Sequence, residues 1–167
     1  MADEVVVLGM IDFELPFDIP RYSGDMRRDQ LAELSKPAAG ELYVAIMQIE
    51  TLLEHRYGQT FRIADGVVSA GSIKFRDGQL IVTAPALAYI LVGYSFVVGY
   101  PDLRSGVLAM LGDVNLAIET VAPMFTSVLF APQSPEKVAD EVILFLPPDV
   151  QRRLGREGDP PQLLTNQ

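Results

Sequence analysis

The chain has 167 residues, 49% of them hydrophobic, which suits one domain with a sizeable core and excludes global disorder. Its formal net charge of −9 disfavours nucleic acids as partners, because binding to phosphates depends on lysine and arginine. It contains no cysteine, which excludes disulfides, thiolate metal sites and cysteine nucleophiles and favours the cytoplasm as its compartment.

The first part of the chain combines β-branched and proline-containing segments. Residues 4–13 are rich in valine and predict a strand, with a bulge at Gly9. Residues 15–20 contain two prolines and predict an extended connector. Ser23 is a typical N-cap residue, so we expect residues 23–34 to form a short helix.

The next helix has the clearest apolar periodicity in the sequence. Four apolar residues after position 41 recur at helical spacing: Leu42, Ile46, Ile49 and Leu53. Gly58 follows this helix as a C-cap. Residues 60–82 then have the composition of strands, and the pairs Asp65-Gly66 and Asp77-Gly78 are both hairpin signals. We therefore expect a three-stranded antiparallel meander in this region.

The most apolar part of the chain is residues 80–100, which carry no charge. Residues 80–82 have the pattern of a strand end, whereas Thr83 and Pro101 suit the start and the stop of a helix. One long apolar helix is therefore expected over residues 84–100. It would span roughly 24 Å, which is less than the ~30 Å of a bilayer core. Burial in the protein core or against a neighbouring subunit is therefore favoured over lipid.

The C-terminal part predicts a second helix followed by short elements. An apolar stripe after Pro101 predicts an amphipathic helix over residues 102–121. The later segments are a strand or helical remnant at 126–131, a short helical turn at 135–140, a final strand at 142–146 and a flexible polar tail at 151–167. Together these elements predict one α+β domain over residues 1–150. In it a small antiparallel sheet packs with amphipathic helices and one long apolar helix.

No motif in the sequence carries recognisable chemistry, and we expect neither a cofactor nor a metal site. The apolar helices instead favour a non-catalytic assembly protein, which self-associates or completes a larger complex through residues 84–121. The residues expected at that interface are Leu87, Ile90, Leu91, Tyr94, Phe96, Val97, Leu103, Val107, Met110 and Leu111.

Two other classes of function are compatible with the sequence. The first is a small membrane protein at the inner face of the cell membrane, in which residues 80–100 insert as an anchor or as part of an oligomeric pore. The second is an enzyme whose site uses Glu50, Glu54 and His55, because a histidine beside two carboxylates can act as a base or as a weak metal site. The simpler interpretation of these three residues is a solvated helix end, where a cation stabilises the helix dipole.

Overall fold

The computed structural model describes residues 4–19, 26–27, 36–69, 71–93 and 102–154. These residues form an α+β fold, as predicted, which is built on one antiparallel sheet with the strand order β2-β3-β4-β1-β5. The strands are β1 (Val5–Ile19), β2 (Met26–Arg27), β3 (Arg62–Ser69), β4 (Gly71–Thr83) and β5 (Ser127–Pro132).

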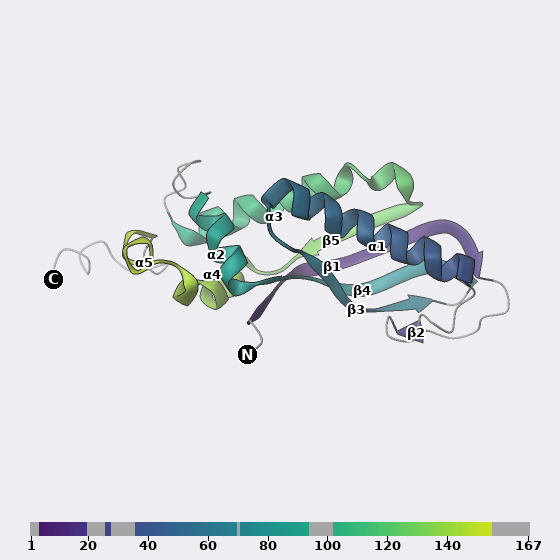
Figure 1. The fold of residues 1–167 in the computed structure, drawn as a ribbon, viewed down its shortest axis with the longest axis horizontal. Helices are drawn as coiled ribbons and strands as arrows, with labels where there is room; N and C mark the ends of the chain where they lie inside the picture. The colour runs from purple at the N-terminus through teal and green to yellow at the C-terminus, as the bar shows by residue number, and fades with distance from the viewer. Residues whose placement is uncertain (1–3, 20–25, 28–35, 70, 94–101, 155–167) are drawn as a thin grey trace.

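Helices cover one face of this sheet. They are α1 (Lys36–Tyr57), α2 (Ala84–Gly93), α3 (Leu103–Glu119), α4 (Pro135–Val142) and α5 (Pro148–Leu154), with the 3-10 turns η3 (Ala122–Met124) and η4 (Ile143–Phe145). Figure 1 shows α1 and α3 side by side over the sheet, whereas α2, α4 and α5 gather toward one end of the molecule. The core lies between the two layers, where β1 contributes the buried side chains of Leu8, Ile11 and Phe13.

α1 confirms the helix that the apolar periodicity predicts. Its four periodic residues are all buried: Leu42, Ile46, Ile49 and Leu53. The helix ends where Gly58 adopts a φ of 71° and donates its N–H to the carbonyl of Glu54 at 2.8 Å. This left-handed conformation is the one that a C-cap glycine supplies at little steric cost.

The expected three-stranded meander is wrong, because residues 62–83 form a single long hairpin of β3 and β4. Neither Asp-Gly pair makes a turn: Asp65 pairs with Gly78 in the middle of the two strands. A Cβ atom on Gly66 would lie 2.2 Å from the Cζ atom of Phe75, and one on Gly78 would lie 2.3 Å from its Cε1 atom. The glycines are therefore required because the ring of Phe75 packs directly against the backbone.

The long apolar helix is not found in the described residues. Residues 80–82 belong to β4, as predicted, and Thr83 caps the following helix by accepting the N–H of Ala86 at 3.4 Å. That helix, α2, ends at Gly93 after ten residues, and residues 94–101 lie outside the described part. Over the described ranges, no helix is long and apolar enough to cross a membrane.

Three shorter elements complete the comparison with the sequence-based predictions. Asp102 caps α3 by accepting the N–H of Ser105 at 2.7 Å, which confirms the second predicted helix. Met26–Arg27 pair with β3 as a short strand instead of joining a helix over 23–34, whose other residues lie outside the described part. The expected strand at 142–146 is instead helical, because Val142 completes the buried face of α4 and η4 follows directly.

Candidate interaction surface

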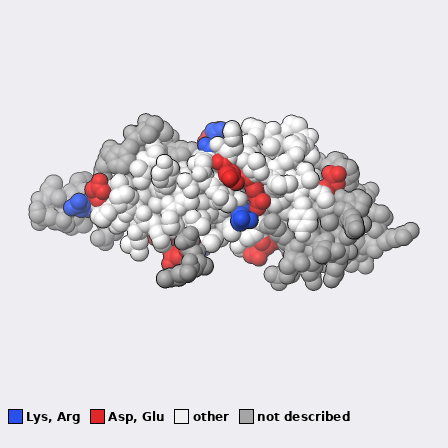
Figure 2. All heavy atoms as spheres, in the orientation of Figure 1, with Lys and Arg blue, Asp and Glu red and all other residues white. Residues whose placement is uncertain are grey.

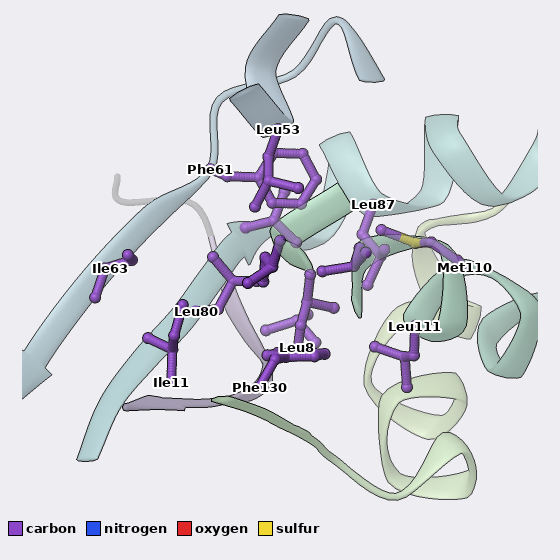
Figure 3. Packing of buried hydrophobic residues seen from close by; sticks show 14 of the residues in the cluster. Leu8, Ile11, Leu53, Phe61, Ile63, Leu80, Leu87, Met110, Leu111 and Phe130 are labelled. Atoms are coloured by element: carbon purple, nitrogen blue, oxygen red, sulfur yellow. The ribbon is translucent and has the colours of Figure 1, made fainter. Parts of the chain in front are cut away.

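The predicted interface residues lie largely in the core of the domain itself. The buried ones are Leu87, Ile90 and Leu91 of α2 and Leu103, Val107, Met110 and Leu111 of α3. Figure 3 shows Leu87, Met110 and Leu111 pointing toward the sheet among the other core side chains. The remaining three, Tyr94, Phe96 and Val97, lie outside the described residues. In the described part, these predicted interface residues are therefore buried within the domain and not at its surface.

The three candidate catalytic residues do not converge on one site. A carboxylate oxygen of Glu50 accepts the backbone N–H of Ile63 at 2.8 Å, so this side chain ties α1 to β3. Glu54 and His55 are exposed on the last turns of α1. Among residues that the structure describes, no group of three histidine or acidic side chains is arranged to hold a metal ion.

A charged cluster instead joins the two helices above the sheet. Asp113 of α3 accepts hydrogen bonds from Nε of Arg56 at 2.8 Å and from the hydroxyl of Tyr57 at 2.6 Å, and a second nitrogen of Arg56 also contacts it. The hydrogen bond to Asp113 raises the pKa of Arg56 above its usual value. These groups hold the end of α1 against α3, which is a structural role.

A second ion pair joins α3 to α4. Arg104 donates from Nε to a carboxylate oxygen of Glu136 at 2.6 Å, and the hydroxyl of Ser134 donates to the other oxygen at 2.8 Å. The hydrogen bond from Arg104, followed by those from the backbone N–H of Glu136 and from Ser134, lowers the pKa of Glu136 to about 2. Both partners are solvent-exposed, so this pair also orients helices and offers no enclosed site for a reaction.

The described surface contains an apolar groove between α2 and η4. We call it the α2–η4 groove; its volume is about 500 Å³, and its lining residues are Pro85, Ala88, Tyr89, Val92, Gly93, Phe145 and Pro147. Tyr89 is 72% exposed, and Leu144, which precedes the lining residue Phe145 in η4 and is not itself a lining residue, is 79% exposed. No lining residue is charged. Figure 2 shows a largely uncharged surface over the part of the molecule where Figure 1 places α2 and α4.

The sequence analysis does not identify this groove. Its expected helix is apolar on all sides, so it gives no reason to choose Tyr89 over the neighbouring Leu87. Leu144 and Phe145 fall in a segment expected to be a strand, where alternation would have buried one of them. The polar hydroxyl of Tyr89 is the one available signal, because tyrosine is frequent at interfaces.

Comparison with models of protein families gave no match. Curated proteins and solved structures likewise gave no match to this chain.

Proposed function

We propose that this chain is a non-catalytic interaction protein, and that an apolar segment of a partner polypeptide docks in the α2–η4 groove. The observation that carries this proposal is the concentration of exposed apolar side chains there, with Tyr89 and Leu144 the two most exposed large hydrophobic residues in the described part. A contiguous exposed apolar patch on a soluble domain is characteristic of a binding surface.

The energetic argument rests on these two side chains. Full burial of a side chain of this size contributes roughly 1.5–3 kcal/mol. Tyrosine is moreover among the residues that dominate binding energy, because its rigid ring covers a large area with few rotatable bonds. Tyr89 and Leu144 are therefore the residues whose truncation would weaken binding most.

Charge specifies the chemistry of the partner. The whole chain has a formal charge of −9, although α4 and α5 carry both exposed carboxylates (Asp140, Glu141 and Asp149) and exposed cations (Lys137 and Arg152). The net negative charge of the chain favours a segment whose apolar residues are flanked by lysine or arginine. Like charges would repel an acidic segment.

The test is site-specific photo-crosslinking in intact cells. A benzophenone amino acid replaces Tyr89 in one variant and Tyr43, an exposed tyrosine of α1, in a matched control. We expect the Tyr89 probe to give a discrete product whose crosslinked peptide is apolar with basic flanks, and Leu144→Asp to abolish it. A Tyr89 probe that gives no more product than the Tyr43 probe refutes the proposal, as does an acidic crosslinked peptide.

A further inference from the structure

Among the residues that the structure describes, the sheet ends at β5, whose outer edge pairs with no other strand. On one side β5 pairs with β1, and α3 is the described helix that packs most closely on it, over its inner face. At the opposite edge of the sheet, β2 pairs with β3. An edge strand presents unpaired N–H and C=O groups, and these can pair with another chain.

The register of β5 identifies which groups point outward. The N–H of Gln133 donates to the carbonyl of Leu8 at 2.8 Å, which makes this a hydrogen-bonded pair. In an antiparallel ladder such pairs recur every second residue, so Leu129 bonds toward β1. The N–H and C=O groups of Val128 and Phe130 therefore face the free edge.

The side chains of β5 leave this edge open to self-pairing. The strand Ser127–Pro132 has no charged residue, and its protecting feature is Pro132, which lacks an N–H and limits pairing to Ser127–Ala131. Leu129 is 63% exposed on the face of the sheet opposite the helices, while Phe130 is buried beneath them. The nearest charged residues of the sheet, Asp12 and Glu14, belong to β1 and lie one strand away from this edge. A second copy that pairs with β5 therefore meets an apolar side chain and no charge within the strand itself.

We propose that a second copy of this chain pairs antiparallel with β5, with Leu129 on the two-fold axis. Val128 of each copy then exchanges hydrogen bonds with Phe130 of the other, because both present their backbone groups at this edge. The two Leu129 side chains lie about 5 Å apart and cover each other. This inference goes beyond the proposed function, because it uses a different surface and a different partner.

The same pairing brings a segment of the second copy toward a second groove. An opening of about 390 Å³ between α3 and β5 is lined by Leu108, Gly112 and Asn115 on one side and by residues 130 and 132–135 on the other. Pairing about Leu129 places the start of β5 of the second copy, which follows the η3 turn, opposite the end of β5 that borders this groove. Met124 is exposed in one copy, and its flexible side chain suits an irregular apolar opening.

The experiment measures solution mass by light scattering during size-exclusion chromatography. We expect the wild-type chain to have twice the monomer mass of 18.3 kDa. Leu129→Lys places two like charges on the axis and should give the monomer. Leu116→Lys makes the same change at a leucine of α3 that is 61% exposed, and it should leave the dimer intact. Thermal unfolding of both variants verifies that they are folded.

Mixing provides a test that is specific to the two-fold axis. Leu129→Lys mixed with Leu129→Glu should restore the dimer mass, because opposite charges then meet across the axis. A monomeric wild type overturns the proposal, as does a dimer that survives Leu129→Lys or dissociates equally with Leu116→Lys. Tyr89→Asp should leave the dimer mass unchanged while it abolishes partner binding, so failure at either surface is distinguishable from failure at the other.

Discussion

Substitution of Gly78 by alanine should destabilise the fold mainly through contact with the ring of Phe75, with a lesser contact to Cγ2 of Ile63 at 3.0 Å. The added Cβ atom would lie 2.3 Å from Cε1 and 2.9 Å from Cζ of that ring. The ring cannot yield, because Phe75 is fully buried and stacks on Phe13 with centroids 4.9 Å apart. Overpacking of this kind costs about 3 kcal/mol at its upper end. Alanine loses less backbone entropy on folding than glycine, which offsets about 0.5–1 kcal/mol of this cost. The free energy of unfolding should therefore fall by about 2 kcal/mol.

A double-mutant cycle tests this reasoning, because leucine at position 75 lacks both ring atoms in contact. Phe75→Leu alone should cost about 1.5 kcal/mol. If the two effects were independent, the double variant would lose about 3.5 kcal/mol; we expect only about 1 kcal/mol, because the steric conflict is absent. Urea unfolding of the four proteins gives these free energies. Additive losses for Gly78→Ala and Phe75→Leu would refute the role of the ring.

Two further predictions concern the carboxylates. Glu50→Ala should destabilise the fold by about 1–3 kcal/mol in urea unfolding, because it removes the acceptor of the buried Ile63 N–H. The control Glu54→Ala should change the free energy of unfolding by less than about 0.5 kcal/mol. Equal effects of the two substitutions would contradict this prediction. The Glu136 carboxylate should titrate by NMR near pH 2, and nearer 4.5 in Arg104→Gln. Since its pKa is lower in the folded state, the pair stabilises the fold above pH 4.5 and loses this contribution as the pH falls toward 2.

The parts of the fold that the sequence predicts well are those that local chemistry determines. The α1 helix follows from the spacing of Leu42, Ile46, Ile49 and Leu53 together with Gly58, and α3 follows from the apolar stripe after Pro101. In each case the cap and the apolar periodicity agree. The α+β class follows from the same elements, because alternating and helical patterns occur in separate segments.

The hairpin of β3 and β4 shows where local signals fail. Asp65-Gly66 and Asp77-Gly78 have the composition of two-residue turns, and Asp65, Gly66 and Asp77 do adopt positive φ. They adopt it in the middle of paired strands, where the side chain of Asp12 accepts the N–H of Asp77 at 2.8 Å. The sequence reports the conformation of the residues correctly. It does not report that Phe75 needs the space above the glycines, because that requirement arises from tertiary packing.

The candidate site is harder to predict for a related reason. Hydrophobicity measures how much surface a segment must bury, and it does not say against what. Leu87 and Tyr89 are two residues apart on one helix, yet Leu87 is 0% exposed and Tyr89 is 72% exposed. Most apolar side chains of α2 and α3 are buried inside the domain, where these helices pack on the sheet. The surfaces that we propose for partners are therefore among those that remain after the core is complete: the α2–η4 groove and, in the part of the chain that the structure describes, the outer edge of β5.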